Sequence, residues 1–132
     1  MRSLIVEDDQ TCSLVLATLL GPYGTSVVVG DGEAAITAFT SALAGGQPFD
    51  LVCLDILMPG LDGAACLRCL RAIEHGFGRD GSAGARILMT TSVNTPESIF
   101  ASFRNQCEGY LTKPITRNRL LEQLALLGLA TA

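Results

Sequence analysis

Reactive polar side chains follow four short apolar runs of this sequence. They are carboxylates, a hydroxyl and the ammonium of the chain's one lysine, namely Glu7, Asp8, Asp55, Thr91 and Lys113. Carboxylates placed together repel one another unless a cation lies between them. Oxygen ligands without nearby His or Cys favour Mg²⁺, with Mn²⁺ as the alternative. A carboxylate can also form an acyl phosphate, so Asp55 is the candidate nucleophile.

The ammonium and the hydroxyl complete this chemistry. Lys113 can place a mobile point charge against one phosphoryl oxygen, and Thr91 can donate a hydroxyl to another. Phosphoryl transfer requires mainly in-line positioning and neutralisation of charge. Each residue alone also has a structural interpretation, because acids cap helices and polar residues populate turns. Asp8 or Asp9 could cap the first helix.

The elements that must position these groups alternate along the chain. Apolar and β-branched runs predict strands at residues 4–6, 25–29, 51–54, 87–89 and 109–112. Helical spacing, stop signals and the possible capping residues Asp62 and Thr116 predict helices at residues 10–20, 31–43, 62–75, 96–105 and 116–127. Serial βα units with right-handed crossovers form an α/β, doubly wound parallel sheet with helices on both faces. Carboxyl ends of its strands share one crevice, where the reactive groups should meet.

Composition narrows the function classes. The chain has 132 residues, of which 48% are hydrophobic and 17% charged, so we expect one globular domain over 1–132. Its formal net charge is -4 without a basic cluster, which argues against direct nucleic-acid binding. No apolar run reaches the ~20 residues of a membrane helix. Acids follow the start too soon for a signal peptide, so we expect a cytoplasmic protein without membrane partners.

Four segments carry a resemblance to a known family. They are Val6–Asp9, Leu54–Gly63, Met89–Ser92 and Gly109–Pro114. In this order they resemble the signature blocks of the receiver domain of two-component response regulators. The resemblance implies a CheY-like, flavodoxin-like fold, with five helices around five strands in the order 2-1-3-4-5.

The resemblance also implies residue roles. Asp55 would be the phosphoacceptor, and Mg²⁺ would be held by Glu7, Asp8, Asp55 and the backbone carbonyl of Leu57. Thr91 would be the switch hydroxyl, Tyr110 the switch aromatic and Lys113 the phosphate-binding lysine, with a cis bond between Lys113 and Pro114. The donor would be a phosphohistidine on a sensor histidine kinase or phosphotransfer protein.

Output would pass through the surface of the fourth helix, fifth strand and fifth helix to another protein, whose identity the sequence does not give. Extra leucines in the last helix indicate a sticky surface there and suggest a homodimer. We expect a phosphoacceptor that assists its own phosphorylation and dephosphorylation, not a turnover enzyme. Two alternatives stay open: a degenerate receiver used for docking or dimerisation, and an aspartyl-phosphate phosphatase of the haloacid-dehalogenase type. A phosphatase of this type requires a second acid two residues after its nucleophile, and position 57 is Leu.

Overall fold

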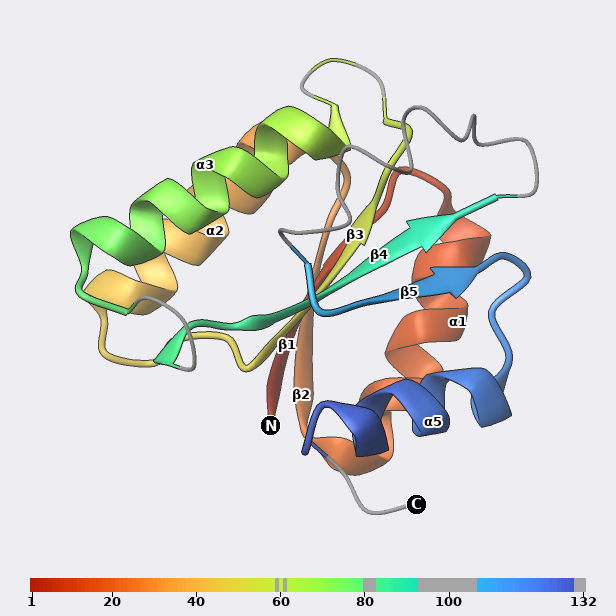
Figure 1. The fold of residues 1–132 in the computed structure, drawn as a ribbon. Helices are drawn as coiled ribbons and strands as arrows, with labels where there is room; N and C mark the ends of the chain where they lie inside the picture. Colours follow the sequence, from red (N-terminus) through yellow and green to blue (C-terminus); the bar gives the residue numbers. More distant parts are fainter. Residues whose placement is uncertain (59, 61, 80–82, 93–106, 130–132) are drawn as a thin grey trace.

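A five-stranded parallel sheet in the order β2-β1-β3-β4-β5 forms the centre of the computed structural model (Figure 1). The structure describes residues 1–58, 60, 62–79, 83–92 and 107–129. The strands are β1 (Arg2–Val6), β2 (Thr25–Val29), β3 (Leu51–Asp55), β4 (Arg86–Thr91) and β5 (Gly109–Thr112). The predicted fold class and strand order are therefore confirmed.

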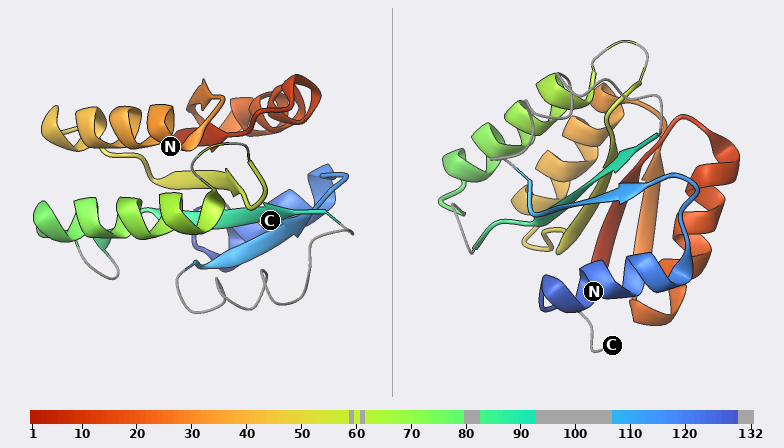
Figure 2. Two further views of the ribbon diagram at one scale, coloured as in Figure 1. Left: turned by 90° about the horizontal axis from the view of Figure 1, so that it is seen from above. Right: turned by 45° about the vertical axis from the view of Figure 1, so that its right-hand side comes forward.

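Helices cover both faces of this sheet. They are α1 (Gln10–Leu20), followed by the short 3₁₀ helix η1 (Gly21–Tyr23), α2 (Gly32–Ala44), α3 (Gly63–Gly76) and α5 (Arg117–Leu126). The views in Figure 2 place α2 and α3 on one side of the sheet and α1 and α5 on the other. The helix expected at residues 96–105 lies outside the described residues. Within the part of the chain that is described, no helix is long and apolar enough to cross a membrane.

Alternating side chains of the strands build two separate cores. In β1, Leu4 and Val6 pack with the α2 and α3 residues Phe39 and Leu67. The intervening Ile5 belongs to the other core, which includes Leu16 and Leu20 of α1 and Leu120 and Leu124 of α5. A strand directs successive side chains to opposite faces, so continuous apolar runs are expected where both faces are covered. The apolar runs in the sequence are a consequence of this burial.

Each described α-helix begins after a side chain that accepts a backbone N–H. These capping residues are Asp9, Asp31, Asp62 and Thr116. Such caps satisfy donors that have no partner within the helix. Asp9, and not Asp8, caps α1 by accepting from the N–H groups of Thr11 and Cys12. Asp8 does not cap this helix and lies at the carboxyl end of the sheet, after β1.

β4 is longer than the sequence pattern predicts. It reaches Thr91 because the Thr90 carbonyl accepts from the Ile56 N–H at 3.1 Å and the Thr91 carbonyl accepts from the Lys113 N–H at 2.7 Å. Polar side chains at these positions do not interrupt the backbone pairing with β3 and β5. Thr90 and Thr91 are therefore the last two residues of β4 and lie at the same end of the sheet as the other reactive groups.

Candidate functional site

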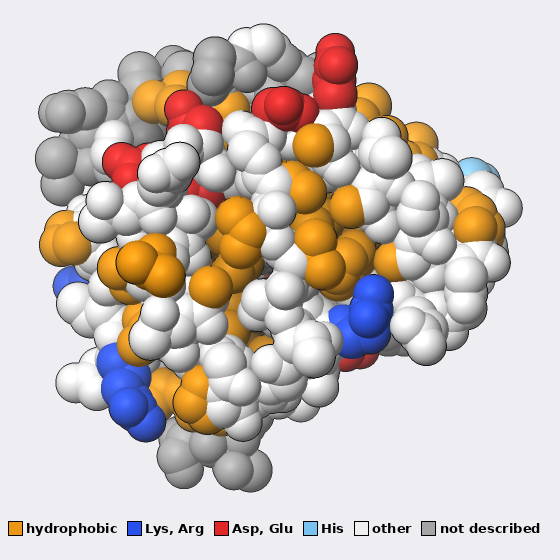
Figure 3. All heavy atoms as spheres, turned by 180° about the vertical axis from the view of Figure 1, so that it is seen from behind, with side chains coloured by type: hydrophobic (Ala, Val, Ile, Leu, Met, Phe, Trp, Pro, Cys, Tyr) orange, Lys and Arg blue, Asp and Glu red, His pale blue; other side chains and the backbone are white. Residues whose placement is uncertain are grey.

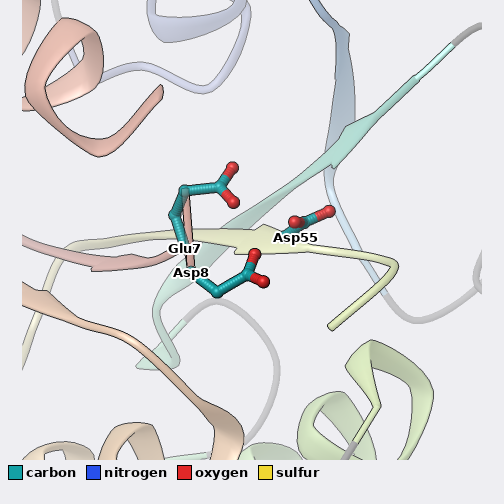
Figure 4. A group of neighbouring side chains, drawn as sticks. All are labelled: Glu7, Asp8 and Asp55. Atoms are coloured by element: carbon teal, nitrogen blue, oxygen red, sulfur yellow. The ribbon is translucent and has the colours of Figure 1, made fainter. Parts of the chain in front are cut away.

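The side chains of Glu7, Asp8 and Asp55 converge at the carboxyl end of the sheet (Figure 4). One carboxylate oxygen from each residue lies within 4.8 Å of the others. Glu7 and Asp8 follow β1, and Asp55 ends β3, the neighbouring strand. Glu7 and Asp55 are 3% and 6% exposed, whereas Asp8 faces solvent. The arrangement brings residues nearly fifty positions apart into one acidic group.

Backbone N–H groups hold two of these carboxylates in place. The N–H of Asp9 donates to Oε2 of Glu7 at 3.2 Å. The N–H of Leu57 donates to Oδ1 of Asp55, also at 3.2 Å. A hydrogen bond to an ionised oxygen favours the charged form and restricts the side chain. Nothing in the sequence pattern indicates these donors, because they depend on the turns after β1 and β3.

Lys113 reaches into the acidic group from the end of β5. Its Nζ lies 2.7 Å from Oε1 of Glu7 and 3.3 Å from Oδ2 of Asp55. The peptide bond between Lys113 and Pro114 is cis, as expected from the sequence. The ammonium is thus placed between two buried carboxylates and does not point into bulk solvent.

Burial and charge shift the ionisation of this cluster. Burial raises the pKa of Glu7 above its ordinary value, although the hydrogen bond from Lys113 acts in the opposite direction. Burial alone would lower the pKa of Lys113, but its interactions with Glu7 and Asp55 together raise it. Lys113 therefore stays protonated at neutral pH. One ammonium shared by two carboxylates leaves the cluster with excess negative charge.

The donor set fits a hard divalent cation. All three converging groups are carboxylates, and no His or Cys among the described residues joins them. Mg²⁺ binds through a few carboxylates and keeps several waters. The exposed position of Asp8 opens the cluster to solvent on that side, which leaves room for such waters. Glu7, Asp8 and Asp55 are therefore the residues that would hold the ion.

Leu57 and Thr91 are hydrogen-bonded through their backbones to residues of this cluster, and Tyr110 lies on the strand that leads to Lys113. Leu57 follows Asp55 with its side chain 47% exposed. Thr91 is buried at the end of β4, and its carbonyl accepts from the Lys113 N–H. Tyr110, half-buried in β5, packs against the core on the side of α2 and α3. These positions place all three near the carboxyl edge or on the strand leading to Lys113.

Gly63 is a site residue that the sequence analysis missed. A Cβ at this position would lie 2.6 Å from the carbonyl oxygen of Asp55 and 2.8 Å from Cα of Ile56. The Gly63 N–H also donates to the Ile56 carbonyl at 3.2 Å. The first turn of α3 therefore presses on the backbone of the nucleophile strand. Only glycine allows that approach, and the adjacent Asp62 drew attention in the sequence as a helix cap.

Cys66 and Cys69 form a Cys-x-x-Cys pattern in the sequence, a spacing found in metal and redox sites, but the structure gives such a site no support. Cys66 is buried in the core, and burial raises the pKa of its thiol to about 11. Neither cysteine belongs to a metal-binding group within the described residues. Cys66 therefore acts as a small apolar residue of α3.

Comparisons with known proteins agree with this geometry. The family model of the response regulator receiver domain matches residues 3–125. The chain is 33% identical over 122 residues to the sensor histidine kinase GacS of Pseudomonas protegens, a match that covers 92% of this chain and 12% of GacS. It is 29% identical over 124 residues to the DNA-binding response regulator MtrA of Mycolicibacterium paratuberculosis, covering 93% of this chain and 49% of MtrA.

A solved structure shows the same fold. The receiver domain of the sensor histidine kinase PA1611 from Pseudomonas aeruginosa PAO1 matches with a TM-score of 0.75 and 25% identity. The match covers 96% of this chain and 97% of that domain, which has a magnesium ion coordinated in its active site cleft. The chain spans less than half the length of GacS and MtrA. It belongs to the response regulator receiver domain family.

Proposed function

We propose that this receiver domain accepts a phosphoryl group on Asp55 as part of two-component signal transduction. The observation that carries the proposal is the placement of the Asp55 carboxylate at the end of β3. It lies within 4.8 Å of the acids Glu7 and Asp8 and 3.3 Å from the Lys113 ammonium. These are the groups that a phosphoryl acceptor needs around its nucleophile.

In the proposed reaction, an oxygen of Asp55 attacks phosphorus and forms an acyl phosphate. The bond between phosphorus and the donor's nitrogen breaks, and the leaving imidazole keeps the electron pair and takes up a proton. Lys113 supplies positive charge to a phosphoryl oxygen, and the Thr91 hydroxyl donates to another. A Mg²⁺ ion held by Glu7, Asp8, Asp55 and the Leu57 carbonyl would supply further positive charge in the same place.

Relatives support a phosphohistidine protein as the donor. GacS and PA1611 are named as sensor histidine kinases, and MtrA as a DNA-binding response regulator. We propose that a sensor histidine kinase or a phosphotransfer protein phosphorylates this chain. Because the chain has no basic cluster, we propose that its own 132 residues signal by contact with another protein.

The proposed switch couples Asp55 to the surface of β5 and α5. A phosphoryl group on Asp55 attracts the Thr91 hydroxyl, and the space this leaves admits the ring of Tyr110. Thr91 and Tyr110 lie on neighbouring strands, since β4 pairs with β5. Phosphorylation then shifts the population of two arrangements of this surface.

We also propose that the chain does not turn over phosphate esters. A haloacid-dehalogenase-type phosphatase would need an acid two residues after its nucleophile, and that position is Leu57, whose side chain is half exposed. Incubation with a phosphate ester and Mg²⁺ should release no phosphate beyond the amount of protein present. Multiple turnover would support the phosphatase instead.

Labelling with radioactive acetyl phosphate tests the proposed function. The wild-type chain should gain a base-labile label in the presence of Mg²⁺ and lose it when a chelator is present. Asp55→Asn should abolish the label. Asp50→Asn is the matched control, because Asp50 lies at the amino end of the same strand, where its Oδ2 accepts from the Arg2 N–H. A folded wild-type chain that takes no label would instead support the docking module.

A further inference from the structure

The edge strand β2 presents an apolar surface that the proposed phosphoacceptor site does not use. β2 pairs with β1 and forms one edge of the sheet. Val27 and Val28 of this strand are 40% and 48% exposed. Figure 3 shows the face of the molecule that contains β2, with hydrophobic side chains gathered across its middle. Acidic side chains lie along its upper margin, and Lys or Arg side chains lie in its lower part.

The backbone of β2 is also open on its outer side. Its inner side faces β1, as two hydrogen bonds at the ends of the pair show. The Thr25 N–H donates to the Met1 carbonyl at 3.1 Å, and the Glu7 N–H donates to the Val29 carbonyl at 3.0 Å. Backbone groups alternate in direction along a strand. Those of Ser26 and Val28 therefore point away from the sheet. They form a short row of donors and acceptors available to another strand.

β2 contains no residue of the types that usually prevent an edge strand from pairing with another strand. Its five residues are Thr-Ser-Val-Val-Val, without a charged residue or a proline. Proteins commonly protect exposed edges with Lys, Pro, bulges or a covering element. β-Branched residues favour extended pairing. An edge with these properties is expected to be covered by a further strand.

We propose that β2 pairs with β2 of a second copy of this chain, antiparallel about a two-fold axis through Val27. Ser26 of each copy then lies opposite Val28 of the other, and both exchange their outward N–H and C=O groups. The two Val27 side chains meet on the face that carries α2. The sheets of the two copies become one continuous sheet, and the closed pair leaves no β2 edge exposed.

The distribution of charge selects the antiparallel orientation. The carboxyl end of β2 leads to the exposed acids Asp31 and Glu33. The amino end lies beside Arg2, which is the β1 partner of Thr25. Antiparallel pairing brings the acidic end of each copy to the Arg2 end of the other, whereas parallel pairing would set acids against acids.

Arg2 lies on β1, one strand in from this edge, and its side chain contacts the segment that precedes β3. Its guanidinium lies 5.1 Å from the ring centre of Phe49, and its Nε donates to the Gln47 carbonyl at 3.1 Å. The same side chain lines a surface hollow with Val27 and Ala38. The positive charge therefore belongs to the same surface hollow as the valine that would lie on the two-fold axis.

The interface is small, so the dimer should form reversibly with concentration. A five-residue strand edge and its immediate flanks bury less than the roughly 1,600 Å² in total that is typical of stable complexes. Sedimentation velocity of the full 132-residue chain should show a concentration-dependent shift from monomer towards dimer. Hydrogen exchange in the peptide that contains β2 should slow over the same concentration range.

Two variants of Val28 test the pairing directly. Val28→Pro removes an N–H that points outward, so the bonds between β1 and β2 remain. Val28→Lys leaves the backbone intact and places a charge at the edge. Both variants should remain folded by circular dichroism and monomeric at concentrations where the wild type forms dimers.

Leu126→Lys is the matched control, because Leu126 is 79% exposed on α5, and α5 packs on β5 at the edge of the sheet opposite to β2. This variant should form dimers as the wild type does. The proposal is overturned if the wild type stays monomeric throughout. It is also overturned if the Val28 variants form dimers as well as the wild type, or if Leu126→Lys abolishes the dimer, which would assign the contact to α5.

Discussion

Glu7 and Glu74 are equally buried, at 3% exposure each, but lie at opposite ends of the sheet with different partners. Glu74 of α3 has both oxygens matched: Oε1 lies 2.8 Å from Nη1 of Arg71, and Oε2 accepts from the Ala85 N–H at 2.5 Å. Glu7 competes with Asp55 for the one ammonium of Lys113. Burial is the same in both places, so the difference lies in the neighbouring charges, since Glu7 converges with two further carboxylates.

At the ion-paired end, two carboxylates share the guanidinium of Arg71, and all four of their oxygens accept hydrogen bonds. Nη2 of Arg71 contacts both oxygens of Glu108, at 2.7 and 2.8 Å, and Oε2 of Glu108 accepts from the Ile87 N–H at 2.7 Å. This network joins α3 to the starts of β4 and β5. At the carboxyl end, by contrast, three carboxylates converge beside one ammonium, which has fewer donors than a guanidinium. A cation and a phosphoryl group can correct that imbalance together, which is the physical basis of the proposed function.

The largest expected effect on stability is at the ion-paired end. Glu74→Ala removes a buried carboxylate and leaves the Arg71 guanidinium and the Ala85 N–H without it. Breaking a buried pair costs about 3 to 5 kcal/mol, and we expect a loss near the lower value because Arg71 is 26% exposed. Urea unfolding measures this free energy. A loss below about 1 kcal/mol, which is typical of a surface ion pair, would show that the buried Glu74 carboxylate stabilises the fold little.

Lys113 should matter most at the reactive end. Lys113→Met should slow labelling of Asp55 roughly 10- to 100-fold, because a hydrogen bond to a charged group contributes about 1.5 to 3 kcal/mol. Lys113→Arg should not restore the rate, since a planar guanidinium cannot take the place of a compact ammonium. Arg117→Met, a change in an exposed cation at the start of α5, is the control. Equal rates in all the variants would show that Lys113 does not touch the phosphoryl group.

Gly63→Ala tests the close approach of α3 to the nucleophile strand. The added Cβ would collide with the backbone of Asp55 and Ile56, so the variant should lose about 1 to 3 kcal/mol of unfolding free energy. Gly76→Ala, at the other end of α3, is the matched control because a Cβ there meets nothing within 4 Å. Thermal unfolding followed by circular dichroism compares the two. Equal stability of both variants would refute the constraint.

When no divalent metal is present, Glu7→Gln should raise or leave unchanged the free energy of unfolding, whereas Glu74→Ala should lower it. Burial raises the pKa of Glu7 in the folded protein above its ordinary value of 4.5. The ionised form therefore disfavours folding, and this penalty appears as the pH rises from 4.5 through the raised pKa. Above that window the variant should be at least as stable as the wild type; below it the difference should vanish. Urea unfolding in a chelator at several pH values checks this sign.

With Mg²⁺ present, the wild type should become more stable than Glu7→Gln. An ion that binds the folded wild type stabilises it by about 2.7 kcal/mol at a hundred times its dissociation constant. Glu7→Gln and Asp8→Asn should gain less, because each removes one of the converging carboxylates. Asp62→Asn, which changes the cap of α3 outside that group, is the control. Equal stabilisation of all the proteins by Mg²⁺ would place its binding elsewhere.

The smallest change in labelling is expected for Tyr110. Tyr110→Ala should leave the labelling of Asp55 unchanged, because the side chain packs on the core side of β5 and is not part of the acidic group. It should instead remove the difference in hydrogen exchange of α5 between labelled and unlabelled protein. If labelling failed as well, Tyr110 would be part of the acceptor site and the proposed coupling would be wrong.

The sequence predicted the convergence of the site because that depends on local patterns. Apolar runs located the strands, and capping side chains such as Asp62 and Thr116 located the starts of the helices. In a parallel sheet, polar residues that end strands must share one edge. Asp55 and Lys113, which are fifty-eight residues apart, could therefore be brought together without coordinates.

The remaining features depend on pairings between side chains and backbone that no local pattern contains. The contact of Arg71 with Glu108 requires the orientation of α3 over β4 and β5. The approach of Gly63 to Asp55 requires the loop that leads into α3. The exposure of Val27 and Val28 depends on which faces of β2 the helices leave uncovered. Such features follow from packing, which a single sequence does not specify.

Mapping the phosphoryl group on the wild-type chain decides whether Asp55 is the acceptor. After labelling with a purified phosphohistidine donor and Mg²⁺, borohydride reduction of the acyl phosphate and peptide mass spectrometry identify the acceptor. The account predicts one modified residue, Asp55, whose carboxylate lies between the acidic pair and Lys113. Modification of Glu7, Asp8 or any residue away from this edge in place of Asp55 would contradict it.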